Sequence, residues 1–245
     1  MATKSVNQLD SRAFETDRRL EKSKISSLRT TVGAIPWNYD RSELFADRVI
    51  HFVGVGMGLG AATTLIVLTC GSNASIHPVI VAGYALCLLA MLVFSAAYNL
   101  CPVSPRKWLL RRFDQSAIYL LIAATYTPFI TQLNDRDLAA SLLVALWSAA
   151  VVGIVLRLLF PGRFDRLSVV LYIAMGWSGI IAFDKAVASL SGSILTLIAT
   201  GGVLYTLGVI FHLWERLRYQ NAIWHVFVLL GAACHFTAVW DLAIA

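Results

Sequence analysis

Long uncharged apolar runs alternate with short charged segments along most of the chain, and this pattern predicts membrane-spanning helices. No Asp, Glu, Lys or Arg occurs from Val49 to Pro105, which is long enough for two spans of about 20 residues each, broken at Gly71–Pro78. Further uncharged runs follow to the end of the chain. We therefore predict an all-α, polytopic membrane protein with seven transmembrane helices, at about residues 49–70, 79–100, 115–133, 138–157, 167–184, 193–214 and 220–241.

The junction between the N-terminal segment and the first span carries helix-start signals. Asp40 and Glu43 have the spacing of an N-cap residue and its reciprocal partner. Trp37 and Tyr39 precede them, as in the aromatic belt of a membrane interface. The pattern predicts a short surface helix that leads through Asp47 into the membrane.

Basic residues are concentrated on one side of the predicted spans. Nine Lys and Arg residues precede the first span, and the loops after the second, fourth and sixth spans contain four, three and two, which gives 18. The opposite side has only Arg136 and Lys185. Since cytoplasmic loops retain Lys and Arg, we predict a cytoplasmic N-terminus and an external C-terminus.

Composition supports a membrane protein and limits its partners. Hydrophobic residues make up 58% of the chain and charged residues 14%, against about 25% charged residues in a soluble domain. The net charge of +6 does not indicate nucleic-acid binding, because the basic residues lie in short stretches between apolar runs. We predict a polar, partly disordered cytoplasmic tail over residues 1–40 and a transmembrane domain over 41–245. The expected partners are lipids of the cell membrane, with homo-oligomerisation left open.

Four alternating glycines occur in the first span, at 54, 56, 58 and 60. A dinucleotide-binding fingerprint does not fit, because its third glycine falls on Leu59 and no strand precedes the motif. Pairs such as Gly56 and Gly60 instead favour close approach of another helix.

Polar residues recur at one predicted membrane depth, next to the basic loops. Ser95 and Asn99 are four residues apart, as are Asn221 and His225, so each pair lies on one helix face. Polar groups at membrane depth are costly and mark functional sites, so these positions predict an inward-facing site. Its members are His51, Ser95, Asn99, Asp114, His212, Glu215, Asn221 and His225.

A simpler interpretation is available for each of these residues. Polar side chains near a membrane interface also serve as caps or as hydrogen bonds between helices. Asp114 can pair with Arg111 or Arg112, which precede it closely. His235 lies ten residues beyond His225 and is expected to bond between helices. His77, before Pro78, is expected to be exposed.

Four segments resemble the hemolysin III proteins, the bacterial relatives of the progestin and adipoQ receptor family. The resemblance extends from about Glu43 to Val239. The segments are 43–51 (ELFADRVIH), 95–99 (SAAYN), 112–129 (RFDQSAIYLLIAATYTPF) and 222–236 (AIWHVFVLLGAACHF).

The resemblance implies a seven-helix fold with a zinc site near the cytoplasmic face. The family serine corresponds to Ser95, the aspartate that opens the third span to Asp114, and the second histidine of the last span to His225. The other two histidine ligands fall on Asn99 and Asn221. Because amide oxygens suit magnesium or calcium better than zinc, this degenerate set predicts weak or absent zinc. His51 and His212 are the possible replacement ligands.

Two classes of function follow from the resemblance. The first is a non-enzymatic membrane protein with a cytoplasm-facing polar cavity: a lipid sensor, a receptor or a cytolysin, in which the asparagines form a hydrogen-bonded network. The second is a zinc-dependent hydrolase of a lipid amide or ester, similar to a ceramidase, with Asp114 and Ser95 as catalytic residues. Loss of two of three ligands favours the first class.

Overall fold

The structure, a computed structural model, describes residues 40–71, 76–214 and 216–244. Within these ranges the chain is helical and has no strand, which confirms the predicted all-α class. Residues 1–39 of the predicted tail, with Trp37 and Tyr39, and Glu215 lie outside the described residues. The elements are α2 (Arg41–Gly71), α3 (Pro78–Leu100), α4 (Pro105–Ile130), α5 (Arg136–Leu159), α6 (Asp165–Gly176), the 3-10 helix η1 (Ser178–Ala182), α7 (Phe183–Ser189), α8 (Gly192–Leu213) and α9 (Gln220–Ile244).

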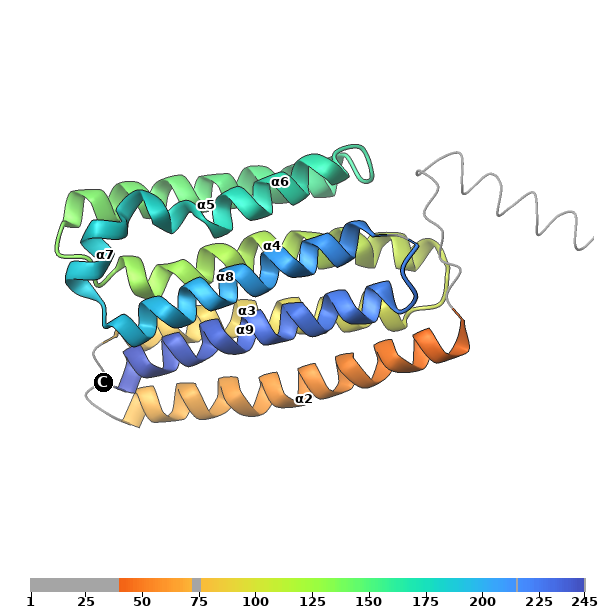
Figure 1. Cartoon of the computed structure of the whole chain (residues 1–245), viewed down its shortest axis with the longest axis horizontal. Helices are drawn as coiled ribbons and strands as arrows, with labels where there is room; N and C mark the ends of the chain where they lie inside the picture. The colour runs from red at the N-terminus through yellow and green to blue at the C-terminus, as the bar shows by residue number, and fades with distance from the viewer. Residues whose placement is uncertain (1–39, 72–75, 215, 245) are drawn as a thin grey trace, which may run out of the picture.

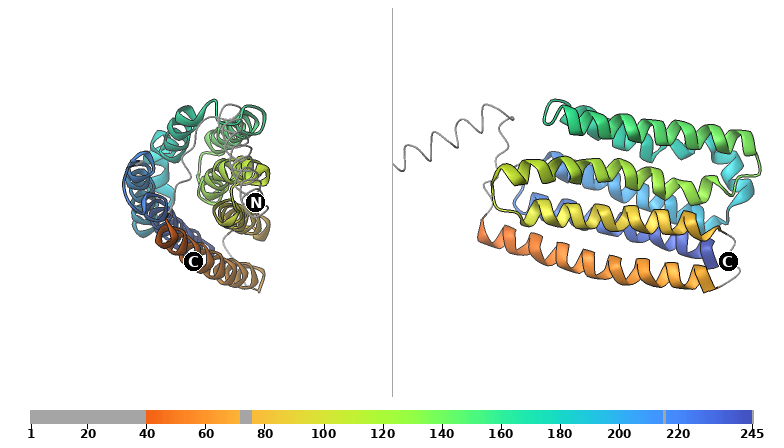
Figure 2. Two further views of the ribbon diagram at one scale, coloured as in Figure 1. Left: turned by 90° about the vertical axis from the view of Figure 1, so that its right-hand side faces the viewer. Right: turned by 180° about the vertical axis from the view of Figure 1, so that it is seen from behind.

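The long helices lie side by side in one bundle (Figure 1). Helices that are neighbours in the sequence pack against each other, and α2 also packs against α9, so the first and last described helices close the arrangement (Figure 2). Helix α4 contacts α6 and α9 in addition to its sequence neighbours. Helix α4 therefore contacts four other helices, and the candidate site forms beside it.

Among the described residues, six helical stretches are long and apolar enough to cross a membrane, one fewer than predicted. The helix that falls short is α4, which overlaps the predicted span 115–133. Its first ten residues contain four basic side chains and Asp114, which lower its hydropathy. Polar groups in such a helix are tolerated where neighbouring helices cover them. The six stretches are α2, α3, α5, Asp165–Ser189, α8 and α9.

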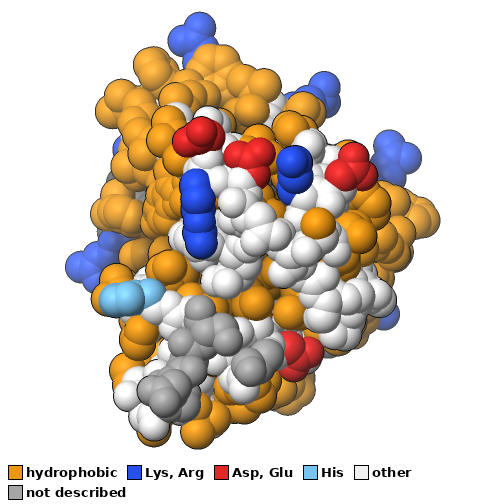
Figure 3. All heavy atoms as spheres, turned by 90° about the vertical axis from the view of Figure 1, so that its left-hand side faces the viewer, with side chains coloured by type: hydrophobic (Ala, Val, Ile, Leu, Met, Phe, Trp, Pro, Cys, Tyr) orange, Lys and Arg blue, Asp and Glu red, His pale blue; other side chains and the backbone are white. Residues whose placement is uncertain are grey.

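The outer faces of the helices are apolar. Phe52, Met57, Leu86, Val144 and Ile181 are among many large hydrophobic side chains that are exposed. A soluble monomer rarely exposes contiguous apolar surface of this extent, whereas a lipid environment favours it. Figure 3 views the bundle from the end at which α2 ends, and a few acidic and basic side chains lie there among hydrophobic ones.

Helix α2 begins with the predicted reciprocal cap. The Glu43 amide donates to Asp40 Oδ1 at 2.8 Å, and the Asp40 amide donates to Glu43 Oε2 at 2.9 Å. The Ser42 hydroxyl also donates to Asp40, and these bonds to the carboxylate lower the pKa of Asp40 to about 2. The expected separate surface helix is not present, because α2 continues without a break from Arg41 to Gly71.

The glycines of α2 act differently from the prediction. A Cβ added at Gly56 or Gly60 would meet no atom within 4 Å, so no neighbouring helix among the described ones packs closely against these two positions. Instead, a Cβ at Gly54 would lie 2.9 Å from Leu229, and one at Gly58 would lie 2.3 Å from Leu92. The close contacts therefore involve the other pair of glycines, against side chains of α9 and α3.

The stretch Asp165–Ser189 is not one regular helix. Helix α6 ends at Gly176, and η1 and α7 complete the stretch. The Tyr126 hydroxyl donates to the Gly176 carbonyl, and Trp177 Nε1 donates to Thr206 Oγ1 at 3.0 Å. Side chains of α4 and α8 thus form hydrogen bonds with residues at the break. Irregular backbone at membrane depth is tolerated where other parts of the protein cover it in this way.

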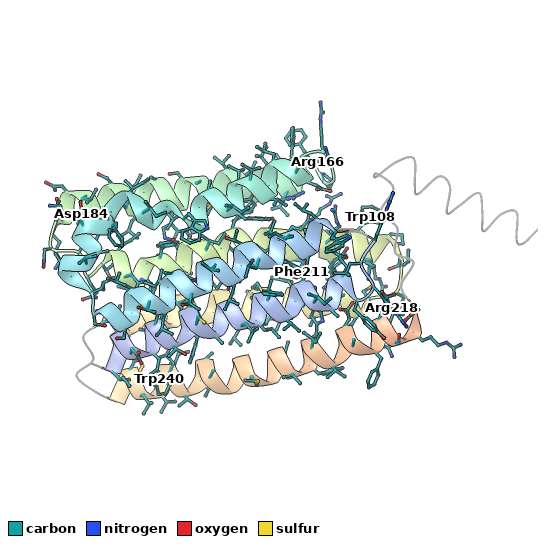
Figure 4. The ribbon with its side chains drawn as sticks, in the orientation of Figure 1. Trp108, Arg166, Asp184, Phe211, Arg218 and Trp240 are labelled. Atoms are coloured by element: carbon teal, nitrogen blue, oxygen red, sulfur yellow. The ribbon has the colours of Figure 1, made fainter. Side chains whose placement is uncertain are left out.

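The two ends of the bundle differ in charge. We call the end at which α2 begins the basic end, because the α3–α4, α5–α6 and α8–α9 turns, with most of the arginines, lie there. Trp108, Arg166 and Arg218 lie toward this end, and Asp184 and Trp240 lie toward the opposite end (Figure 4).

Candidate functional site

Three helices bring buried polar side chains together near the basic end. His51 of α2, Ser95 of α3 and His225 of α9 are all buried. The His51 and His225 ring centroids are 4.4 Å apart in an edge-to-face arrangement, and His51 Nε2 lies 3.4 Å from Ser95 Oγ. The structure therefore joins three of the residues that the sequence predicted for one site.

The two asparagines belong to the same cluster and bond to each other. Asn221 Nδ2 donates to Asn99 Oδ1 at 2.9 Å, which links α9 to α3. Asn99 Nδ2 donates to the Ser95 carbonyl at 2.9 Å, one turn earlier on α3. Hydrogen bonds thus fix the orientation of both amides. We use the name polar cluster for six residues: Asp47, His51, Ser95, Asn99, Asn221 and His225.

Asp47 is the member that sequence reasoning did not place in the site. Its side chain accepts a hydrogen bond from Asn221 Nδ2 at 2.8 Å, and only 4% of the residue is exposed. Its other oxygen, Oδ1, is buried without a hydrogen-bond partner among the described residues. The available signal was its position four residues before His51, on the same face of the helix.

The backbone of Asp47 also orients His51. His51 Nδ1 lies 2.7 Å from the Asp47 carbonyl oxygen. Because a carbonyl can only accept, Nδ1 carries the proton and Nε2 presents its lone pair toward Ser95. The imidazole is thereby fixed in one tautomer.

A cavity adjoins the polar cluster and adds one further predicted site residue, Asp114. Ser95, Asp114 and His225 line it, and it continues between α4, α6 and α8 past Tyr126 and Trp177. It offers about 130 Å³ to the centres of water-sized molecules, whereas a single water needs about 10–15 Å³ on this measure. The cavity can therefore hold several waters or part of a larger ligand.

Asp114 faces this cavity and interacts with Ser95. In the simpler interpretation, Asp114 pairs with the preceding arginines. The charge of Arg111 does act on Asp114, but the two side chains form no ion pair. Arg111 Nη2 instead contacts Asp165 at 2.8 Å, and no ion pair of Asp114 occurs among the described residues. Within the described part of the chain, the Asp114 carboxylate is therefore free of an ion pair and can interact with a group in the cavity.

The remaining predicted histidines lie outside the polar cluster. His212 is exposed and its ring lies 5.0 Å from that of Trp224. His235 Nε2 lies 3.2 Å from the Ile198 carbonyl, which confirms the expected bond between helices. His77 is exposed at the start of α3, as predicted, and accepts from the Val79 amide. Of the two proposed replacement ligands, only His51 belongs to the polar cluster.

The side chains present do not fit the three-histidine zinc site that the resemblance implied. The cluster contains two imidazoles in mutual contact, and the Asn99 oxygen accepts from Asn221. Across the described part of the chain, no three His, Cys, Asp or Glu side chains are grouped as metal ligands. Structural and catalytic zinc sites use at least three such protein ligands.

The fold and the cluster together define the class of protein: an integral membrane protein, helical throughout its described residues, with a buried polar cluster at the basic end. The profile of the haemolysin-III-related family matches residues 45–236, and the chain belongs to this family.

Relatives of known sequence agree with this assignment. The hemolysin-3 homolog of Bacillus subtilis (strain 168) is 37% identical over 197 residues, which cover 80% of this chain and 92% of that protein. Hemolysin-3 of Bacillus cereus is 35% identical over 197 residues, 80% of this chain and 90% of that protein. The human monocyte to macrophage differentiation factor is 30% identical over 166 residues, 64% and 67% of the two chains. No solved structure matches the chain significantly.

Proposed function

We propose that this protein is a lipid-sensing, receptor-like protein of the cell membrane, whose cavity receives the polar end of a lipid from the cytoplasmic side. The proposal includes seven spans, with α4 as the additional one, and a basic end that faces the cytoplasm. The observation that carries it is the elongated shape of the cavity and the uneven distribution of polar groups along it.

The cavity follows α4 for about three helical turns. Its α4 lining extends from Asp114 through Ile118 and Ile122 to Tyr126, twelve residues further, and this corresponds to about 18 Å at ~1.5 Å per residue. Ser95, Asp114 and His225 lie at the basic end, and the other lining side chains are mainly apolar or aromatic. A ligand with a hydrogen-bonding head and a hydrocarbon tail matches this distribution.

In this proposal the polar cluster recognises its ligand by hydrogen bonds and does not depend on a metal. Asn221 bonds simultaneously to Asp47 and Asn99. These contacts hold the amides in place, while Ser95 and Asp114 remain available along the cavity wall. Pre-organised polar groups of this kind select a ligand that satisfies them and disfavour one that leaves them unpaired.

Filling the cavity tests the proposal. Ile118→Trp places an indole in the cavity, and we expect it to lower the lipid that copurifies with the protein several-fold, as measured by mass spectrometry of a solvent extract. Val144→Trp is the matched control, because Val144 is 68% exposed on the outer face of α5. Equal lipid content in the two variants and the wild type would contradict a lipid-binding cavity.

A hydrolase of a lipid amide or ester is the second candidate function. It is favoured by one observation, the joint presence of Ser95, Asp114 and His225 on the cavity wall. In the family pattern, zinc would activate the attacking water. The side chains present here do not fit the three-histidine site that would hold the zinc. Metal content therefore separates the two candidates.

A further inference from the structure

A second group of buried polar side chains lies between α4, α5 and α6, apart from the polar cluster. Arg112, Ser116 and Tyr119 follow one another at intervals of four and three residues on one face of α4. This face is turned toward α5, because a Cβ added at Gly153 would lie only 2.3 Å from the Tyr119 ring. Arg112 Nη1 also donates to the Leu158 carbonyl of α5 at 3.3 Å.

Helices α5 and α6 contribute to the same group. Arg157 follows Gly153 by one turn and is only 2% exposed. On α6, Ser168 is buried near Tyr119, and the Tyr172 ring centroid lies 4.5 Å from that of Tyr119. We call the whole group the arginine–hydroxyl cluster, which consists of Arg111, Arg112, Ser116, Tyr119, Arg157, Asp165 and Ser168.

The charges of the arginine–hydroxyl cluster do not balance among the described residues. Of its three guanidinium groups, those of Arg111 and Arg157 share the carboxylate of Asp165, at 2.8 Å in the case of Arg111, whereas Arg112 has no ion pair among the described residues. Buried charges are normally paired, because desolvation of an unpaired ion is costly. The charge of Arg111 also acts on the neighbouring Asp114 carboxylate. The three arginines therefore retain an excess of at least one positive charge.

The cluster also has hydrogen-bond donors in excess. The Nε atoms of Arg112 and Arg157 and the Ser116 hydroxyl are buried and have no hydrogen-bond partner in the described part of the chain. The buried hydroxyls of Tyr119 and Ser168 make no hydrogen bond of normal geometry there, although Tyr119 interacts with Ser168 and Tyr172. Each unpaired buried donor is destabilising. One group with several acceptor oxygens and a negative charge would satisfy both deficits.

We propose that the arginine–hydroxyl cluster is a binding site for a phosphate group. Guanidinium groups bind phosphate oxygens through two parallel N–H donors, and hydroxyl groups complete the coordination of the remaining oxygens. The group enters beside Asp165, whose side chain is 41% exposed at the start of α6. A phospholipid headgroup and a free phosphate ion share this chemistry, and basic pockets between helices at this depth suit lipid headgroups.

The test measures thermal unfolding of the full-length protein in maltoside micelles. Added phosphatidylglycerol is compared with a galactosyl diacylglycerol, which has the same tails and no phosphate, and inorganic phosphate is compared with chloride at equal ionic strength. We expect phosphatidylglycerol or phosphate to raise the unfolding midpoint of the wild type by several degrees at about 100 times the dissociation constant.

Three variants and one control locate the effect. Tyr119→Phe and Ser168→Ala each remove a hydroxyl that makes no hydrogen bond of normal geometry within the described ranges, and both preserve packing, so they should fold. They should require about tenfold more ligand for the same shift, since loss of about 1.4 kcal/mol is tenfold in affinity. Arg112→Gln should lose most of the shift. Arg163→Gln, at an exposed arginine two residues before Asp165, should respond like the wild type.

Each outcome decides the proposal. A shift with phosphatidylglycerol alone assigns the site to a lipid headgroup, and a shift with inorganic phosphate as well assigns it to the phosphate group from either source. The proposal is overturned if neither ligand stabilises the wild type, or if Tyr119→Phe and Ser168→Ala respond as strongly as Arg163→Gln.

Discussion

The environment of Asp114 differs from that of an ordinary interfacial carboxylate. It faces the cavity beside Ser95, and the neighbouring Arg111 pairs with Asp165. Asp184, in contrast, is exposed in the first turn of α7, at the opposite end of the bundle (Figure 4).

We expect Asp114→Ala to destabilise the protein by about 1–3 kcal/mol, because the buried groups around it lose a hydrogen-bond partner. Asp184→Ala should change stability by less than about 0.5 kcal/mol, as is usual at an exposed position. The measurement is the thermal unfolding midpoint of both variants in one detergent. Equal shifts would show that Asp114 is only a surface charge.

Contacts within one helix were predictable from the sequence, and contacts between distant residues were not. The four-residue spacing correctly placed Ser95 and Asn99 on one helix face, where the Asn99 amide bonds to the Ser95 carbonyl. The role of Asp47 could not be predicted from spacing, because its partner, Asn221, comes from the last helix. Spacing likewise could not distinguish His51, which is buried in the cluster, from His212, which is exposed.

At the scale of elements, uncharged runs indicate where helices cross the bundle but not where a helix is interrupted. The break after Gly176 is stabilised by Tyr126 and Thr206, which belong to other helices. The hydropathy pattern along one sequence does not identify partners that are distant in that sequence. For the same reason the glycine pattern of α2 predicted close contacts correctly in kind but assigned them to Gly56 and Gly60 rather than Gly54 and Gly58.

The convergence of α3 and α9 leads to a prediction about metal. Asn99→His together with Asn221→His adds two imidazoles to His225, from the two helices that the Asn99–Asn221 hydrogen bond joins. Three imidazoles and a water complete a tetrahedral site, so we expect the double variant to retain about one zinc per chain after dialysis against a weak chelator. The wild type should retain well below one, and each single variant should gain little.

Zinc measured per protein, for the wild type, both single variants and the double variant, distinguishes the possibilities. Full occupancy in the wild type would contradict the proposed metal-independent cluster and would assign a ligand role to His51. An empty double variant would mean that α3 and α9 do not approach closely enough to share a metal.

The distribution of charge over the whole molecule predicts its orientation in the membrane. Helix α2 begins at the basic end, and α9 ends at the opposite end (Figure 1). Because basic turns are retained in the cytoplasm, the basic end should face the cytoplasm and the C-terminus should be external. This arrangement requires α4 to cross the membrane as well as the six stretches that meet the length and hydropathy requirements.

Reporter fusions test this orientation. A reporter that is active only outside the cytoplasmic membrane should be active when fused after Ala245 and silent when fused before Met1. The loop at residues 131–135, between α4 and α5, should also be external, which tests α4 separately. A cytoplasmic reporter at Ala245 together with a cytoplasmic 131–135 loop would show that α4 does not span the membrane.

The hydrogen bond between Asp47 and Asn221 has a consequence for biogenesis. The two residues are 174 positions apart, so at ~5–20 residues per second roughly 9 to 35 s of synthesis separate them. During that interval the carboxylate of α2 has no native partner from α9. The polar cluster therefore cannot assemble until the last helix has been made, and a chain truncated before α9 would have every other helix but no complete site.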